Sequence, residues 1–256
     1  MARATPDFAG LSPLDGPCAI KTACAATSRP RARTPGVNAL GGLLIWGRAN
    51  SVNVQKVLWC CGELGLPFER REAGLHFGMV NSPEYRAMNP NGRVPTLVDG
   101  DVVLWESNSI LRYLALREIE RRPDSQARHL YPAGAAPRAR MERWMDWTLS
   151  TMQPAERPLF WGLVRTRPED RDMAAITAAA KATGNAWKIV DAHLAHGRDY
   201  LEGDDFTLAD ITLGSYVRRW FSMEIESRPD LPRLRRWHDR LSARPAFQSQ
   251  IAGPLS

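Results

Sequence analysis

The chain has 256 residues, of which 44% are hydrophobic and 24% are charged. This composition is typical of a soluble globular protein with one large domain or two smaller ones. The longest apolar run, from Leu40 to Trp46, is too short to span a bilayer, so no membrane association is expected.

Basic residues are not gathered where a nucleic-acid binder would place them. The net charge is +6, and residues 1–40 hold five basic and two acidic side chains, which leaves +3 for the other 216 residues. In that larger part the signs alternate, as in "RPEDRD" from Arg167 to Asp172. Because nucleic-acid binders concentrate positive charge on one face or in one run, nucleic-acid binding is not expected.

The cysteines and the first 41 residues bear on the cellular compartment in which the protein is expected. Cys18, Cys24, Cys60 and Cys61 form no CxxC pair and no disulfide framework, which favours a reducing compartment such as the cytoplasm. Residues 1–41 are rich in Ala, Pro, Thr and Arg without periodicity, so we predict a disordered tail. They lack the compact apolar segment of a secretory signal; a transit peptide and a misassigned start codon are the alternatives.

The first elements alternate between strand and helix. Residues 43–46 form a short apolar run bounded by glycines, which indicates a buried strand. The segment "NSVNVQKVLWCCGELG" has apolar residues at helical spacing, and Gly65 is its stop signal. "LPFERRE" is the second strand, and Ser82 with Pro83 begins the next helix.

Two more strands and a helix complete this part. In "VPTLVDGDVVLW" the pair Asp99-Gly100 is a strong hairpin signal, and a helix follows from Glu106. Strand–helix–strand implies parallel pairing, whereas a hairpin implies antiparallel pairing. We therefore predict an α/β domain of order βαβαββα with a mixed four-stranded sheet over residues 42–118, followed by a linker at 119–136.

Residues 137–256 have only helical patterns. Met141, Trp144 and Met145 share one face of the first helix. A long alanine-rich helix follows, with a predicted interruption near Gly184. "FTLADI" begins a helix with an N-cap threonine and an aspartate three residues later, a variant of the capping box. The second domain is therefore predicted to be all-α.

Three segments resemble the cytosolic glutathione transferase family, with features of its bacterial theta- and nu-like members. They are "WGRANSVNVQKVLWCCGELGLPFE", "MNPNGRVPTLVDGDVVLWESNSILRYL" and "FTLADI", and with the domain order they cover about residues 42–250. The resemblance implies a thioredoxin-like first domain that binds glutathione, a homodimer, a cytoplasmic location and a role in detoxification.

Four residues are implied to hold the tripeptide. In the family the bond between Val94 and Pro95 is cis, so that the backbone of Val94 faces the cleft and pairs with the cysteinyl part of glutathione. A helix that starts at Glu106-Ser107 offers free N–H groups and partial positive charge. Ser107 would then bind the γ-glutamyl carboxylate and Glu106 its ammonium. An ordinary trans proline and simple helix capping are the alternatives.

The glycyl carboxylate of glutathione needs a positive partner. By the resemblance, Arg93 occupies the position of a basic residue near this group, and His76, after the second strand, could reach it. Either side chain could instead be a solvated surface charge.

Catalysis requires the glutathione thiolate, which is the nucleophile. Lowering a thiol pKa of about 8.5 by about two units takes roughly 2.7 kcal/mol. Hydrogen-bond donors at a helix N-terminus can supply this. By the resemblance, Ser51 matches the serine of theta-like relatives and Asn53 the asparagine of some nu-like ones. We predict Ser51 as the main donor and Asn53 as the second; Asn50 is a third candidate.

Two alternatives concern the same helix. Asn50 and Ser51 could merely cap it. Because residues 50–54 contain no cysteine, thiol–disulfide chemistry of the protein itself is not expected. Cys60 and Cys61, two turns further on, are interpreted as core or interface thiols.

The electrophile is expected beside the first long helix of the second domain. Arg157 and Arg165 are eight residues apart, about two helical turns, and Trp161 lies between them. Paired guanidinium groups beside an aromatic ring predict a carboxylate or another anionic group on the electrophile. Surface arginines paired with nearby acidic residues are the alternative.

Together these features predict a glutathione transferase. It would attach glutathione to small electrophiles, displace halide or reduce peroxides. The alternative is a catalytically idle glutathione-binding scaffold or ligand carrier. No metal is expected, because His193 and His196 have ligand spacing but no visible third ligand.

Overall fold

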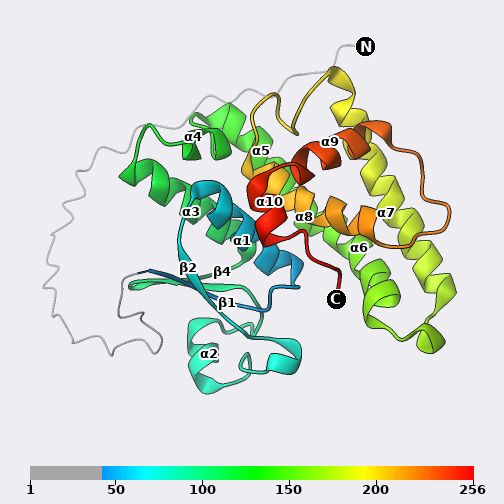
Figure 1. Ribbon diagram of the computed structural model, residues 1–256, viewed down its shortest axis with the longest axis horizontal. Helices are drawn as coiled ribbons and strands as arrows, with labels where there is room; N and C mark the ends of the chain where they lie inside the picture. The colour runs from blue at the N-terminus through cyan, green and yellow to red at the C-terminus, as the bar shows by residue number, and fades with distance from the viewer. Residues whose placement is uncertain (1–41) are drawn as a thin grey trace, which may run out of the picture. The chain divides into compact units, whose positions relative to one another are not determined.

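The structure is a computed structural model in which residues 42–256 are described (Figure 1). Its sheet has four strands in the order β2-β1-β3-β4. They are β1 (Leu43–Trp46), β2 (Phe68–Arg71), β3 (Thr96–Asp99) and β4 (Val102–Trp105). β1 pairs in parallel with β2 and antiparallel with β3, and β3 pairs antiparallel with β4. The predicted mixed sheet is confirmed; the predicted tail at 1–41 lies outside the described residues.

Helices cover both faces of this sheet. They are α1 (Val52–Leu64), α2 (Pro83–Met88) and α3 (Ser107–Arg121), with the short turn η1 (Leu75–Phe77). Alternate strand residues face opposite sides. Ile45 and Leu97 pack into the large core with α1 and α3, whereas Leu44 and Val98 pack with Tyr85 from α2. Figure 1 shows α2 on the side of the sheet away from α1 and α3.

Local signals end and begin these elements as predicted. Gly65 follows α1 at φ 64°, a left-handed conformation that glycine adopts without strain. The hydroxyl oxygen of Ser82 accepts a hydrogen bond from the backbone N–H of Tyr85 at 3.2 Å, which caps α2. Gly100 has φ 58° in the turn between β3 and β4.

The rest of the described chain is helical. The helices are α4 (Ala127–Leu130), α5 (Ala135–Trp147), α6 (Gln153–Phe160), α7 (Met173–His193), α8 (Leu208–Ser222), α9 (Pro232–Ser242) and α10 (Pro245–Gln250). Short one-turn segments are η2 (Thr148–Met152) and η3 (Trp161–Arg165), both π-helical, and η4 (Pro168–Asp170) and η5 (Leu194–His196). α3 extends three residues past the predicted boundary at 118, and α4 lies inside the segment predicted as a linker.

The predicted interruption near Gly184 is wrong, because α7 runs unbroken through it. A Cβ at this position would lie 3.3 Å from Cγ of Pro229 and 3.5 Å from Cη2 of Trp220. The glycine therefore permits close packing instead of ending the helix. An interior glycine costs about 1 kcal/mol of helix stability, which the packing of a long helix can offset.

Asp210 fixes the start of α8, the most buried helix of the second part. One of its carboxylate oxygens accepts hydrogen bonds from the backbone N–H and the hydroxyl of Thr207, both at 2.9 Å. The other accepts from the N–H of Leu201 at 3.0 Å and from Nε1 of Trp237 at 2.9 Å. The predicted capping box is confirmed, and it also joins α8 to α9.

Within residues 42–256, no helix combines the length and the apolar character needed to cross a membrane.

Candidate functional site

A cavity of about 310 Å³ lies where the start of α1 meets α6, η3 and α8. The loops before α2 and before β3 complete its walls. The lining residues that matter chemically are Arg48, Ser51, Asn53, Arg93, Val94, Glu156, Arg157, Phe160, Trp161, Arg165, Tyr216 and Arg219. Of the twelve residues predicted for the site, seven line this single cavity: Ser51, Asn53, Arg93, Val94, Arg157, Trp161 and Arg165.

Ser51 is the N-cap residue of α1, with φ −84° and ψ 124°. Its hydroxyl makes no capping hydrogen bond, so capping does not occupy it. The first turn of α1 is closed by a backbone hydrogen bond, in which the N–H of Gln55 donates to the carbonyl of Ser51 at 2.8 Å. The hydroxyl is therefore available to a ligand at the positive end of a helix.

Asn53 is the second residue of α1, and its side chain contacts α3. The hydroxyl of Ser107 donates to Oδ1 of Asn53 at 3.4 Å. This contact orients the Asn53 amide, and its Nδ2 group has no hydrogen-bond partner within the described chain. Asn53 can therefore donate into the cavity, as Ser51 can.

Glu106 and Ser107 begin α3 beside Asn53 but do not line the cavity themselves. Ser107 is buried, whereas Glu106 is exposed and has φ 70°. A non-glycine residue with positive φ carries strain of about 1–3 kcal/mol, which proteins retain at functional positions. The arrangement leaves the first N–H groups of α3 free for an anion next to an acidic side chain.

A polar network holds the cavity wall at Arg93 and Val94. The hydroxyl of Tyr85 donates to the carbonyl of Arg93 at 2.7 Å, and Nδ2 of Asn89 donates to the same carbonyl at 2.9 Å. Tyr85 and Asn89 also contact the hydroxyl of Thr96 at 2.9 and 3.0 Å. The Val94–Pro95 bond is cis, as the resemblance implied, and buried Pro95 lies behind Val94.

The lining of the cavity is strongly positive. Besides Arg157 and Arg165, the cavity is lined by Arg48 and Arg219, and Glu156 is its one acidic lining residue in the described chain. Arg219 pairs with Glu156 at 3.2 Å and stacks on Phe160, with Cζ 3.6 Å from the ring centre. Cζ of Arg165 lies 5.7 Å from the centre of the same Phe160 ring.

Proximity of these guanidinium groups changes their proton affinity. Burial lowers the pKa of Arg48, and the charges of Arg165 and Arg219 lower it further. Burial and then Arg219 lower the pKa of Arg165. Burial raises the pKa of Glu156, although Arg219 opposes this. An anionic ligand would relieve the repulsion among the arginines.

Two further polar side chains, Tyr216 in the cavity lining and Lys56 in contact with it, are buried. Among residues 42–256, neither the hydroxyl of Tyr216 nor Nζ of Lys56 has a hydrogen-bond partner. The Lys56 ammonium lies 5.1 Å from the centre of the Tyr216 ring. Burial, and then repulsion from Arg219, lower the pKa of Lys56 to about 7, against the attraction of Glu106 and Glu156.

Some predicted residues are not brought to the cavity. Asn50 turns towards the C-terminus, where its Nδ2 donates to the hydroxyl of Ser256 at 2.9 Å. His76 is exposed in η1 and stacks on Phe77, with 3.9 Å between ring centres. Neither lines the cavity.

Sequence reasoning missed Arg48, Glu156, Tyr216 and Arg219 as lining residues. A signal existed for Arg219, since two adjacent arginines interrupt the otherwise apolar helix "ITLGSYVRRWF". For Arg48 the signal was weaker. Gly74, at φ 87°, makes room for it, because a Cβ there would lie 3.1 Å from a guanidinium nitrogen of Arg48.

The chain matches two known family descriptions. Residues 50–117 match "Glutathione S-transferase, N-terminal domain" and residues 144–245 match "Glutathione S-transferase, C-terminal domain". It is 41% identical over 216 residues to glutathione S-transferase GstB of Escherichia coli (strain K12), covering 84% of this chain and all of that protein. It is 34% identical over 217 residues to glutathione S-transferase 3 of Zea mays, covering 82% and 93%.

Solved structures include a similar molecule with a ligand. The theta class glutathione S-transferase of the citrus canker pathogen Xanthomonas axonopodis pv. citri, with glutathione bound, matches with a TM-score of 0.78 and 48% identity. The match covers 84% of this chain and 100% of that one.

Proposed function

The chain belongs to the glutathione S-transferase family and uses glutathione as its co-substrate. From this premise we propose that it catalyses attack of the glutathione thiolate on small electrophiles that carry an anionic group. The observation that supports this proposal is a single cavity that is lined both by Ser51 and Asn53 and by Arg48, Arg157 and Arg165.

In this proposal the protein activates the thiol by stabilising its anion. The Ser51 hydroxyl and the Asn53 amide donate to the sulfur at the positive start of α1. Each hydrogen bond to a charged group contributes about 1.5–3 kcal/mol, so the two together account for a pKa shift of about two units. The thiol proton passes to solvent.

The rest of glutathione is held along the first domain. The backbone of Val94 pairs with the cysteinyl part. Glu106 and the N-terminus of α3 hold the γ-glutamyl ammonium and carboxylate, and Ser107 serves both this end and Asn53. Arg93 faces the glycyl carboxylate. Asn50 and His76 remain secondary candidates, since they lie off the cavity.

The arginine wall orients the electrophile. Its anionic group pairs with Arg157 and Arg165 and its apolar body packs on Trp161, which places the reacting carbon at the sulfur. A carbon–sulfur bond forms; if the carbon bears a halogen, that bond breaks and halide leaves with the electron pair. With a peroxide, two glutathione molecules supply the electrons and become a disulfide.

A matched pair of electrophiles tests the charge preference. 4-Chloro-3-nitrobenzoate and 4-chloro-3-nitrobenzamide differ mainly in charge. We expect the double change Arg157→Gln and Arg165→Gln to lower kcat/KM for the benzoate by about tenfold or more and to spare the benzamide. Arg128→Gln, at an exposed position of α4, is the control. Equal loss on both substrates would contradict the anionic preference.

Activation of the glutathione thiol is tested with the same two electrophiles. Ser51→Ala is expected to raise the pKa of the bound glutathione thiol and to lower kcat. The ultraviolet absorbance of the thiolate, measured against pH, reports this pKa. Full activity in this variant would move the main donor to Asn53. A catalytically idle scaffold or carrier would bind glutathione without shifting its thiol pKa or turning over either aryl halide.

A cytoplasmic homodimer with a detoxifying role completes the proposal. β4 is an edge strand with apolar side chains exposed at Val102 and Trp105, 38% and 39% respectively, which suits burial in a subunit interface. Sedimentation of the wild type and of Trp105→Glu tests it: the variant is expected to dissociate.

A further inference from the structure

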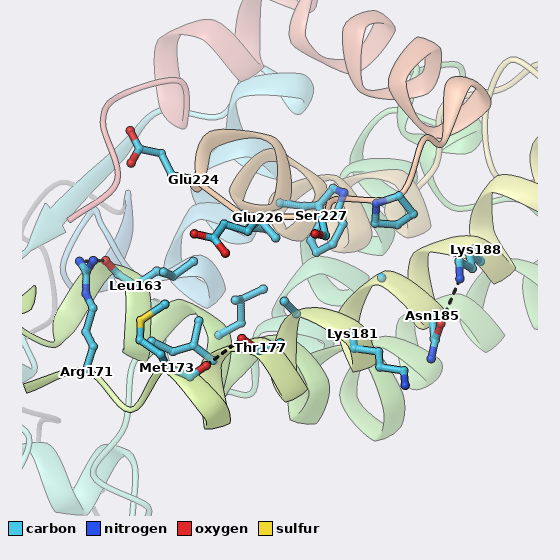
Figure 2. A pocket seen from close by; sticks show the side chains of 17 residues that line it. Leu163, Arg171, Met173, Thr177, Lys181, Asn185, Lys188, Glu224, Glu226 and Ser227 are labelled. Atoms are coloured by element: carbon cyan, nitrogen blue, oxygen red, sulfur yellow. Dashed lines mark hydrogen bonds between the residues drawn. The ribbon is translucent and has the colours of Figure 1, made fainter.

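Two cavities in the helical part of the chain take no part in the proposed transferase mechanism. The larger one, of about 720 Å³, is lined by three basic and two acidic side chains, so its charges nearly balance (Figure 2). The smaller one, of about 190 Å³, lies between α9 and the segment from Leu194 to Asp199, which follows α7. Its lining is strongly positive, and we call it the arginine crevice.

Four guanidinium groups and one carboxylate line the arginine crevice among the described residues. They belong to Arg198, Arg233, Arg236, Arg240 and Asp199. Asp199 pairs with Arg240 at 2.6 Å, and Asp191, outside the lining, pairs with Arg233 at 3.2 Å. Even when both pairs are counted as neutral, Arg198 and Arg236 leave the crevice with a charge of +2.

A neighbouring acidic residue does not cancel this charge. Glu202 lies 3.9 Å from Nε2 of His193, and the same imidazole nitrogen is 2.9 Å from the guanidinium of Arg198. Glu202 already pairs with Arg143 at 2.9 Å and with Arg140 at 3.7 Å. It is therefore outnumbered by arginines in its own surroundings.

Helix α9 aligns three of the four arginines. Arg233, Arg236 and Arg240 are three and four residues apart, so they share one face of the helix. Arg235 lies off this face, where its guanidinium stacks on Phe221 with Cζ 3.6 Å from the ring centre. Like charges at this spacing repel one another, and a bound anion would relieve the repulsion.

Contacts orient these guanidinium groups without using all of their donors. Besides the two ion pairs, the Arg198 guanidinium donates to the carbonyl of His193 at 3.2 Å. Arg236 is exposed and has no hydrogen-bond or ion-pair partner among residues 42–256. Because a guanidinium has five N–H donors, each of the four can also donate to a ligand in the crevice.

The size of the crevice restricts the class of ligand. Sites for drug-sized molecules have about 300–1,000 Å³, and the crevice is smaller than this range. Guanidinium groups donate paired hydrogen bonds to phosphate and carboxylate oxygens. A phosphate group is compact and can carry two negative charges, which matches the charge that the two acidic partners leave uncompensated.

We propose that the arginine crevice binds a phosphate group, either as the free ion or as the end of a small phosphate monoester. Arg198 and Arg236 pair with its oxygens, and Arg233 and Arg240 add further N–H donors. The described residues that line the crevice are all different from those that line the glutathione cavity, and binding requires no chemical step.

Calorimetric titration of the full chain with inorganic phosphate tests the proposal. It is made at slightly alkaline pH, where phosphate is mainly a dianion, with acetate and chloride at the same ionic strength as comparators. We expect phosphate to bind more tightly than either, because neither comparator combines two charges with several acceptor oxygens. Absence of phosphate binding, or equal binding of the three anions, would overturn the proposal.

Substitutions then locate the bound phosphate. Arg236→Gln is expected to weaken its binding about threefold, the range of an exposed ion pair, and Arg198→Gln together with Arg236→Gln about tenfold. The matched control is Arg235→Gln together with Arg128→Gln, which removes the same charge outside the crevice and is expected to preserve the affinity. Equal weakening in the two double variants would show a general effect of net charge and overturn the assignment.

The first cavity is also positive, so it needs its own control. Arg157→Gln together with Arg165→Gln is expected to keep the phosphate affinity. Loss of binding in that variant, with the Arg198 and Arg236 double variant unaffected, would place the anion in the first cavity and overturn the proposal.

Glycerol 3-phosphate distinguishes the two sources of the phosphate group. Tighter binding than that of inorganic phosphate would identify a monoester as the ligand, and weaker binding the free ion. Each variant is compared by its thermal unfolding, so that a folding defect is recognised. All of these readouts are binding measurements, so they stand whether or not the proposed transferase activity holds.

Discussion

The hydroxyl of Ser107 donates a hydrogen bond to the side-chain oxygen of Asn53 across 3.4 Å and 54 positions of sequence. This contact joins the first turns of α3 and α1, so that two helix N-termini meet at one side of the candidate site. Its consequence is chemical, because an amide whose oxygen is engaged presents its N–H groups in the opposite direction.

The first prediction concerns this pair. Ser107→Ala frees the Asn53 amide to rotate, so we expect the pKa of the bound glutathione thiol to rise by about half a unit, or ~0.7 kcal/mol. In an Asn53→Ala background the same change should leave that pKa unaltered, because the residue through which it acts is absent. The thiolate absorbance measured against pH in the four proteins of this cycle gives the result; equal shifts in both backgrounds would exclude the coupling.

A second prediction follows from the buried amine of Lys56. Burial lowers its pKa from 10.5 to about 7, so between these values the unfolded chain binds more protons than the folded one. The free energy of unfolding should therefore rise with pH across this window. Lys56→Met removes the contribution and is expected to be more stable at pH 7, on the order of 2–4 kcal/mol.

Denaturant unfolding at several pH values checks this prediction. The measured quantity is the difference in the free energy of unfolding between Lys56→Met and the wild type. Lys188→Met, at an exposed position of α7, controls for the loss of one positive charge. A difference that stays constant between pH 7 and pH 10 would contradict the prediction.

A third prediction concerns Asp210, whose carboxylate accepts four hydrogen bonds. Loss of a helix cap alone costs about 1–2 kcal/mol. Asp210→Ala also leaves the buried N–H of Leu201 and the indole N–H of Trp237 unpaired, so we expect a loss of at least ~3 kcal/mol. Thr207→Ala, which removes one of the four bonds, should cost about 1 kcal/mol. Similar losses for both variants in urea unfolding would show that the additional partners contribute little.

A fourth prediction concerns the thiols inside α1. Burial raises the pKa of Cys61 to about 12, and it raises the pKa of Cys60 well above its usual value. Because the thiolate is the reactive form, neither side chain should react with Ellman's reagent in the folded protein. Thiol titration of a chain carrying Cys18→Ser and Cys24→Ser is expected to find no reactive thiol before denaturation and two after it.

The order of elements in the first domain was predictable because its signals are local. Gly65 ends α1, Ser82 caps α2 and Gly100 turns the hairpin, and each acts on backbone atoms within a few residues. The same holds for Thr207 and Asp210 at the start of α8. Gly184 misled for the opposite reason, since its role depends on Pro229, which is 45 positions away in sequence.

By itself, then, the sequence determined the succession of strands and helices in the first domain, and it indicated the family. Tertiary structure alone decided that Arg48, Arg165 and Arg219, from three distant segments, line one cavity. It also decided that Tyr216, which lines this cavity, and the buried Lys56 have no side-chain hydrogen-bond partner within residues 42–256. The physical reason is that charge repulsion and burial depend on distances through space, which no local pattern along the chain encodes.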